Sequence, residues 1–250
     1  MSVFCLVHAA FQGAWSWDLL IPQLEAKGHS SVAMDLPIEN PEATLSDYAE
    51  AVIKALPSGE GDVILVGTSM AGIVIPLVAA QCRVRKLVYL AALIPYPGMS
   101  VIEQMYEDVV PDMWKAAGFE APYSSKFEQV RDEPDIFNQS SLEKSPLEDE
   151  AAAMEFLFHD CEPEVANFAV SELRNHLSSA HLTEIFPLQA LPDVESSYIV
   201  CTEDRIISPA WSKYAARKRL GVEAIEFPSG HCPYLSQSAR LAELLTQIAS

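Results

Sequence analysis

Basic side chains are scarce in this chain. Its 250 residues contain 16 Lys and Arg against 35 Asp and Glu, which gives a formal net charge of −19 at pH 7. Neutralising a phosphate backbone requires clustered Lys and Arg, whereas the basic residues here stand mostly apart, except for a short run at 217–219. The composition therefore argues against a nucleic-acid partner.

Long apolar runs are also missing. None approaches the roughly 20 residues that a membrane-spanning helix needs. The first eight residues, MSVFCLVH, contain no Lys or Arg, which a secretory signal would carry at its start. We expect a cytoplasmic protein without a membrane partner.

Cysteine, glycine and proline are too few for two other classes of protein. Five widely spaced cysteines, an odd number, are typical of reduced core residues rather than of a disulfide framework. The 17 Pro and 10 Gly are too few for collagen or a disordered linker. A chain of this length can bury one large core and carry an inserted subdomain.

Short apolar runs rich in β-branched residues alternate with stretches of helical period. This alternation predicts an α/β fold, with a mostly parallel sheet flanked by helices. The expected strands are 3–7, 31–34, 62–66, 86–91, 197–201 and 223–227. The expected helices are 14–27, 44–56, 70–81, 209–220 and 236–248.

The pattern changes over residues 96–185, where no convincing strand occurs and proline interrupts several short amphipathic stretches. We expect a helical cap inserted at 96–185 into a core made of 1–95 and 186–250. The insertion holds 19 acidic and 5 basic residues, a net charge of −14. Such an excess is typical of a solvated outer face, and a role toward substrate is the alternative.

A serine follows one of the expected strands in the run DVILVGTSMAG, residues 62–72. A nucleophile elbow needs small residues two positions before and after the serine, because its strained turn brings backbone segments close together. Gly67 and Ala71 meet this need around Ser69, although Gly is more usual at the second position. The alternative is that Ser69 caps the following helix.

A serine nucleophile needs a histidine base and an acid that orients the base. The strand at 197–201 runs into Thr-Glu-Asp-Arg, and the strand at 223–227 runs into Pro-Ser-Gly-His. These positions favour Asp204 as the acid and His231 as the base, in the chain order usual for this arrangement. Glu203 is the competing acid, and an ordinary loop histidine is the alternative for His231.

The negative oxygen that develops during acyl transfer needs backbone N–H donors. We expect the amide after the nucleophile, Met70, and an amide from the loop after the first strand, for which we nominate Ala10. His8, at the end of that strand, is either a second base or, as histidines at strand ends more often are, a residue that orders its loop.

These motifs resemble those of the α/β-hydrolase superfamily, and in particular its branch of plant methylesterases, hydroxynitrile lyases and bacterial carboxylesterases of the pyrethroid-hydrolase type. The similarity lies in LVHAAFQGAW (6–15), VILVGTSMAG (63–72), IVCTED (199–204), GVEAIE (221–226) and Gly230-His231. It implies that residues 96–185 form a helical cap over the active site. It also implies a surface through which relatives often pair, so a homodimer is compatible with it.

The chain departs from the lyases of this branch at two positions. These enzymes resemble esterases but place a Thr after the first-strand His and a Lys after the catalytic His, where this chain has Ala9 and Cys232. Without an ammonium group to hold cyanide, hydrolysis is the better interpretation. The chain also has Thr68 where His often precedes the nucleophile, which reshapes the pocket wall.

We therefore expect a carboxylesterase that cleaves a small, neutral, largely apolar ester through Ser69, His231 and Asp204. No cluster of metal ligands stands out, so neither a metal nor an organic cofactor is expected. A lyase-like use of the same triad and a small-molecule receptor on the same scaffold remain as alternatives. Aromatic residues of the cap are expected either to line the pocket or to form the core of the cap: Tyr106, Trp114, Phe156, Phe158 and Phe168.

Overall fold

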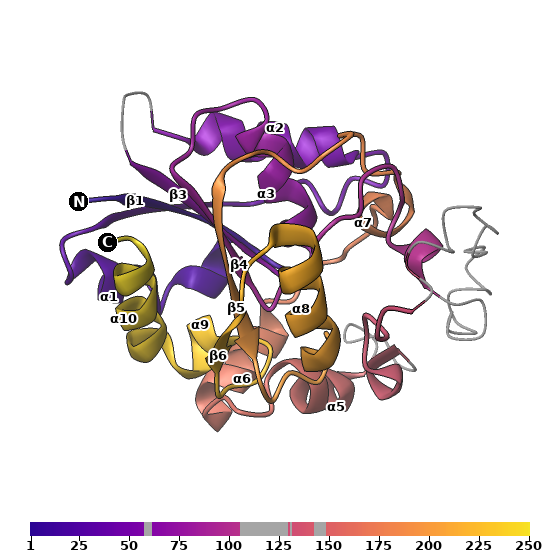
Figure 1. The fold of residues 1–250 in the computed structure, drawn as a ribbon. Coiled ribbons are helices and arrows are strands. Elements are labelled where there is room, and N and C mark those ends of the chain that lie inside the picture. The colour runs from indigo at the N-terminus through magenta and orange to yellow at the C-terminus, as the bar shows by residue number, and fades with distance from the viewer. Residues whose placement is uncertain (58–61, 106–129, 131, 143–148) are drawn as a thin grey trace.

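A computed structural model describes residues 1–57, 62–105, 130, 132–142 and 149–250 (Figure 1). Its centre is a six-stranded parallel sheet with the strand order β2-β1-β3-β4-β5-β6. The strands are β1 Val3–Val7, β2 Ser30–Met34, β3 Val63–Thr68, β4 Lys86–Leu90, β5 Glu195–Cys201 and β6 Ile225–Phe227. The α/β class expected from the sequence is confirmed.

The central strand β3 is buried along its whole length, because helices cover both faces of the sheet. Leu65 faces one hydrophobic cluster, while its neighbours Ile64 and Val66 face the other. In the parallel register, Leu65 lies beside Cys5 of β1 and Leu87 of β4, which belong to the same cluster as Leu65. The unbroken apolar run in the sequence thus corresponds to a strand with two buried faces.

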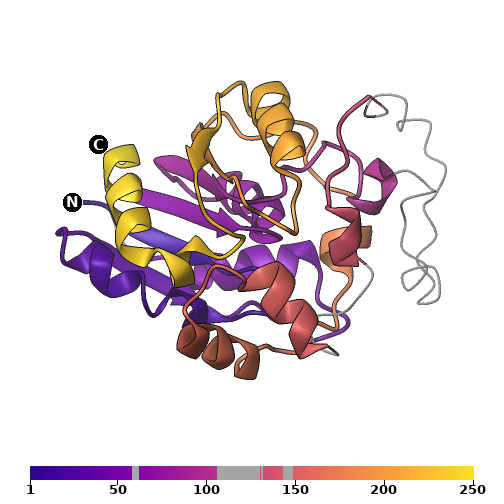
Figure 2. The same ribbon diagram turned by 90° about the horizontal axis from the view of Figure 1, so that it is seen from below.

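Two helical layers enclose the sheet, with α2 and α3 on one side and α1 and α10 on the other (Figure 1). The helices of the core are η1 Ala14–Trp17, α1 Ile21–Glu25, α2 Leu45–Ala55, α3 Ala71–Ala79, α8 Pro209–Ala215, the π-helical turn η7 Ala216–Leu220, α9 Pro233–Ser236 and α10 Ser238–Ile248. The two ends of the chain lie side by side in both ribbon views (Figures 1 and 2).

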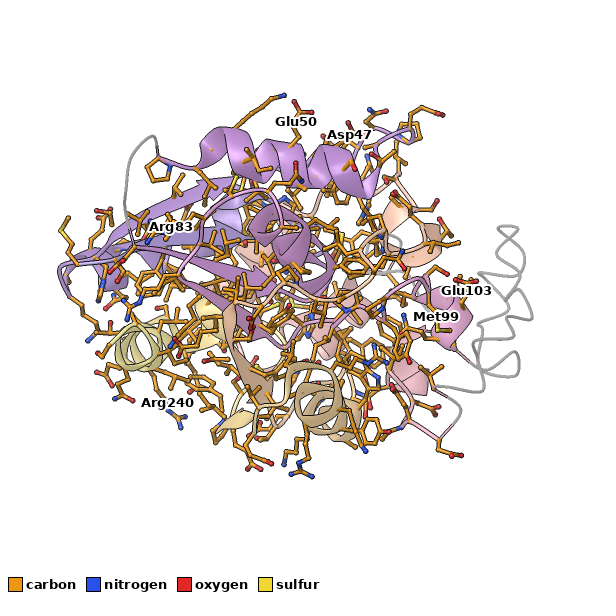
Figure 3. The ribbon with its side chains drawn as sticks, turned by 45° about the horizontal axis from the view of Figure 1, so that its top comes forward. Asp47, Glu50, Arg83, Met99, Glu103 and Arg240 are labelled. Atoms are coloured by element: carbon orange, nitrogen blue, oxygen red, sulfur yellow. The ribbon has the colours of Figure 1, made fainter. Side chains whose placement is uncertain are left out.

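Helix α2 shows how local sequence sets an element boundary. Thr44 and Asp47 form a reciprocal capping box, in which the Asp47 amide donates to Oγ1 of Thr44 and the Thr44 amide donates to Oδ2 of Asp47. Asp47 and Glu50 lie on the side of α2 that faces away from the sheet (Figure 3). The opposite side of the helix buries Tyr48 and Val52.

Between β4 and β5, the described residues form short helices, and Phe137 makes an isolated antiparallel bridge to Ile207, which follows β5. The helices are η2 Ile102–Gln104, η5 Gln139–Leu142, α5 Glu150–Ala152, the π-helical turn η6 Ala153–Leu157, α6 Pro163–Ser171 and α7 Ala180–Thr183. We call the segment 96–185 the cap. Its assignment as a separate domain stays a prediction.

Several expected boundaries shift by a few residues. The helix expected at 14–27 is two shorter helices, and the helix expected at 236–248 has a break at Gln237 between α9 and α10. Gly28, with φ of +82°, follows the turns that end α1, as expected from its conformational freedom. All five cysteines carry free thiols. None of the helices that the structure describes has the length and apolar character needed to cross a membrane.

Candidate active site

Ser69 lies in a strained turn between β3 and α3. Its φ of +52° falls in the left-handed region that non-glycine residues rarely adopt. Four backbone hydrogen bonds hold the turn: the Ser69 amide donates to the carbonyls of Leu90 and Ala91, and the Ser69 carbonyl accepts from the amides of Gly72 and Leu93. The end of β4 thus fixes the conformation that the turn requires.

The close backbone approaches in this turn fall at two glycines. A Cβ at Gly67 would lie 2.9 Å from the carbonyl oxygen of Ala71, and a Cβ at Gly72 would lie 1.9 Å from that of Leu93. The small residues at positions 67 and 71 were expected to permit the turn. The structure places the tightest approach one residue later, at Gly72, so Ala71 is accommodated within α3.

Ser69 does not cap α3, so the alternative role considered for it is wrong. The N-cap residue is Met70, and no side chain accepts a capping hydrogen bond there. Because it has no capping role, the Ser69 hydroxyl is left for another function.

Asp204 and His231 form a buried pair. Asp204 follows β5 and His231 follows β6, so parallel pairing brings both to the same edge of the sheet as Ser69. Nδ1 of His231 lies 2.8 Å from Oδ2 of Asp204, and the two residues are 1% and 6% exposed. The amides of Ile206 and Ile207 donate to Oδ1 of Asp204 at 2.8 and 3.1 Å.

This arrangement determines which nitrogen of the His231 ring carries the proton. An ionised carboxylate only accepts hydrogen bonds, so Nδ1 of His231 is the donor and Nε2 is left free to act as a base. The competing acid, Glu203, is exposed, and only its backbone amide is tied to the His231 loop, through the Ser229 carbonyl. Geometry therefore selects Asp204 over Glu203 as the partner of His231.

Ser69 and His231, both in described parts of the chain, share no hydrogen bond in this structure. Catalytic hydrogen bonds are often long or poorly aligned in a free enzyme and tighten when substrate binds. The structure thus brings Asp204 and His231 into contact, and places Ser69 at the same sheet edge.

The loop after β1 offers backbone donors near this edge. Phe11, in that loop, has a φ of +63°, and with Ser69 and Ala91 it is one of three non-glycine residues with positive φ in the described chain. Neither the Ala10 amide nor the Met70 amide finds a hydrogen-bond acceptor among the described residues. Both amides therefore keep their capacity to bind a developing negative charge.

Comparison with known proteins identifies the family of this chain. Residues 6–244 match the model of the alpha/beta hydrolase family. This chain belongs to that family. It is 30% identical to salicylic acid-binding protein 2 of Nicotiana tabacum, over 98% of this chain and 96% of that protein. It is 29% identical to methylesterase 7 of Arabidopsis thaliana, over 98% of this chain and 95% of that protein.

Among solved structures, the pyrethroid hydrolase PytH is similar in fold, with a TM-score of 0.73 and 19% identity over 100% of this chain and 97% of that one. The branch of the superfamily expected from the sequence is confirmed by the two plant relatives.

In this α/β-hydrolase, His8 orders the loop after β1. The Leu36 amide donates to its Nε2 at 2.9 Å, which leaves Nδ1 to donate to the Ala9 carbonyl at 2.8 Å. Burial lowers the pKa of His8 to about 4, so the ring is neutral at pH 7. Both ring nitrogens are engaged, so His8 has none left to serve as a second base.

Cys232, directly after His231, is part of a buried polar cluster in the hydrolase. Its sulfur accepts from Nε2 of Gln12 at 3.4 Å and from the Tyr234 hydroxyl at 3.2 Å. Burial raises the pKa of its thiol to about 12, so the thiol stays protonated. No group of three or more His, Cys, Asp or Glu in the described chain is arranged to hold a metal ion.

The aromatic residues of the hydrolase's cap divide into three groups. Phe156 and Phe158 are buried, while Phe168 is 49% exposed and packs edge-on against Trp15. Tyr106 and Trp114, also considered as pocket lining, lie outside the described residues.

Sequence analysis did not single out two charged cap residues that contact the loops of His231 and Ala10. Asp160 bonds to the loop of His231, and Arg174 bonds to the loop of Ala10. Both contacts join residues far apart in the chain, and one sequence contains no local signal of such contacts.

Proposed function

We propose that this α/β-hydrolase is a carboxylesterase that uses Ser69 as nucleophile, His231 as base and Asp204 as the orienting acid. The observation that carries the proposal is the buried pair of Asp204 and His231, which leaves Nε2 of the histidine free at the sheet edge that bears Ser69. Its relatedness to a methylesterase and its structural likeness to a pyrethroid hydrolase support the same class of reaction.

In the first half of the proposed reaction, Ser69 attacks the ester carbonyl while Nε2 of His231 takes the hydroxyl proton. The Asp204 carboxylate stabilises the imidazolium that forms. The amides of Ala10 and Met70 donate to the oxyanion, and collapse of the tetrahedral intermediate expels the alcohol, which receives the proton from His231.

In the second half, water attacks the acyl-enzyme. His231 again takes the proton and returns it to the Ser69 oxygen as the carboxylic acid leaves. The strained turn at Ser69 contributes by holding the side chain clear of β3 and α3, so that the ester in the first half and water in the second approach the same position.

A lyase reaction is not supported by the residue that follows His231. Cleavage of a cyanohydrin leaves cyanide, whose charge needs a cation nearby. Cys232 stands there as a buried neutral thiol bonded to Gln12 and Tyr234. Hydrolysis therefore fits these residues better than cyanide release.

The proposed substrate is a small, neutral and largely apolar ester. The cap segment 96–185 has a net charge of −14, which raises the energy of an anionic ligand approaching it. A carboxylated ester should therefore have a lower kcat/KM than its neutral isostere, and the difference should shrink as salt is added. Faster turnover of the carboxylated ester would contradict this preference.

The test is hydrolysis of p-nitrophenyl esters of increasing chain length by the wild type and by Ser69→Ala. We expect kcat to fall by about 10³-fold or more in the variant. Thr44→Ala is the matched control, because it removes the capping hydroxyl of α2, which bonds to Asp47 and to none of the proposed catalytic residues; it should lower stability and leave kcat unchanged. Equal, near-background rates in the wild type and Ser69→Ala would overturn the esterase proposal and favour a ligand receptor.

A further inference from the structure

Helix α6 of the cap lies between two residues of opposite charge, Asp160 before it and Arg174 after it. Each contacts a different loop at the carboxyl edge of the sheet. One loop carries His231 and the other carries Ala10, so the segments on either side of a single cap helix bond to the loops of the base and of an oxyanion donor in the proposed site.

Asp160 is bonded to both sides of the His231 loop. Its Oδ2 accepts from the Gly230 amide at 2.7 Å and from the Ser236 hydroxyl at 2.8 Å. A Cβ at Gly230 would lie 2.5 Å from Oδ1 of Asp160 and 2.7 Å from Cε1 of His159. The cap therefore rests directly on the backbone of the residue before His231.

Arg174 holds the loop after β1 through several groups. Its amide donates to the Phe11 carbonyl at 2.7 Å, and Nη1 donates to the Gln12 carbonyl at 3.3 Å. Nη2 donates at 3.4 Å to the carbonyl of Leu36, in the loop after β2. Nη1 also pairs with Asp35 at 3.2 Å. Since Phe11 is the strained residue next to Ala10, Arg174 is bonded where the loop most needs restraint.

The loop is held a second time through Asp35. The carboxylate that pairs with Arg174 also accepts from the Ala14 amide at 2.7 Å, further along the same loop. A Cβ at Gly13 would lie 2.7 Å from Oδ1 of Asp35 and 3.2 Å from Cδ of Arg174. The two side chains therefore close tightly over the backbone between Gln12 and Ala14.

We propose that Asp160 and Arg174 are positioning residues for the reaction, and that α6 with these two residues forms a brace that sets the base relative to the oxyanion donors. This proposal rests on the proposed esterase function. Misplacement of a reacting group by about 1 Å can cost on the order of 100-fold in rate, so restraint of both loops has a direct kinetic consequence.

The hydrogen bonds and the charge of Asp160 can be tested separately, because a single carboxylate oxygen accepts both of its hydrogen bonds. In Asp160→Asn, the amide oxygen can keep both bonds while the charge is lost. We expect this variant to keep kcat within about threefold, and Asp160→Ala to lose about 10- to 100-fold in kcat with a smaller change in KM. Equal losses in both variants would overturn positioning by hydrogen bonds.

Arg174 is tested with Arg174→Met, which keeps most of the stem and removes the guanidinium. If this group positions the Ala10 amide, kcat/KM should fall about tenfold or more. The inhibition constant of a trifluoromethyl ketone, which forms a tetrahedral oxyanion on the serine, should rise by the same factor. An unchanged inhibition constant beside a lowered kcat/KM would contradict the brace.

The control for general damage to the cap is Asp149→Ala, which removes the N-cap of α5. It should lower stability and leave kcat per active site unchanged, with active sites counted by a fluorophosphonate. If the wild type hydrolyses esters and Asp160→Ala does so equally fast per labelled site, the brace is wrong and the esterase stands. If the wild type neither hydrolyses esters nor takes up the fluorophosphonate, both proposals fall.

Discussion

Gly72 and the carbonyl of Leu93 approach so closely that a Cβ on the glycine would lie 1.9 Å from the oxygen. The contact joins the first turn of α3 to the segment after β4, and the Leu93 amide in turn donates to the Ser69 carbonyl at 2.9 Å. The segment after β4 therefore sets both the space available at Gly72 and the hydrogen bonding of the turn at Ser69.

Gly72→Ala should destabilise the protein by about 3 kcal/mol or more, because backbone rather than a flexible side chain occupies the space. Ala71→Gly, one residue earlier, is the matched control; it restores the more usual motif and should cost only about 1 kcal/mol, the propensity difference within a helix. Urea denaturation of both variants measures the difference. Equal stability losses would show that the turn adapts to a side chain at position 72.

Asp204→Asn should lower kcat by about 10³- to 10⁴-fold, because the amide can stabilise the wrong tautomer of His231 and lacks the charge that stabilises the imidazolium. Glu203→Gln is the control, since its side chain is exposed and only its backbone amide meets the His231 loop. The check is steady-state hydrolysis of one p-nitrophenyl ester over a range of pH. A comparable loss in Glu203→Gln would reverse the assignment of the acid.

Acid should weaken the fold through its buried histidines. Burial lowers the pKa of His181 to about 4 and, with like charge from His181 as a secondary cause, that of His176 to about 2, from 6.5 for the free side chain. Their rings stack at 4.4 Å, and Nε2 of His176 meets the Tyr48 hydroxyl at 3.2 Å. Between about pH 6.5 and 4 the unfolded chain binds protons that the folded chain does not, so stability falls as pH falls.

In that range each such histidine contributes up to about 1.4 kcal/mol per pH unit to the slope of unfolding free energy against pH. His181→Gln should therefore reduce the slope between pH 6 and 5 relative to wild type. Asn175→Gln changes the exposed residue before His176. It removes no titrating group and should keep the wild-type slope. An identical slope in His181→Gln and wild type would contradict the lowered pKa.

Local sequence was sufficient to predict the turn at Ser69 and the contact between Asp204 and His231, while their catalytic roles stay a prediction. The strand, turn and helix around Ser69 are contiguous, so hydrophobic pattern and small residues predict the elbow together. Asp204 and His231 each follow an apolar strand, and the parallel arrangement of strands brings their loops to one edge. Element boundaries were less certain, as the break at Gln237 shows, because packing decides where a helix bends.

The parts that the sequence did not predict depend on contacts between distant segments. Gly72 is confined by a carbonyl that follows the next strand, and Asp160 meets an amide 70 positions later in the chain. Arg174 is 162 positions from the carbonyl of Gln12 that it holds. Hydrophobic period and motif spacing describe neighbours along the chain, so neither could reveal these pairs.

The two chain ends lie side by side (Figures 1 and 2). The order of Ser69, Asp204 and His231 along the chain is therefore not required for their positions in the fold. Lys86, in the strand next to β3, donates from Nζ to the Ile248 carbonyl at 2.7 Å and so fastens the last helix to the sheet. A short linker could therefore join the ends, with the chain reopened at exposed Gly221, where φ is +70° and no atom lies within 4 Å of a Cβ position. Such a circular permutant would carry His231, Ser69 and Asp204 in that order along the chain while every strand kept its neighbours.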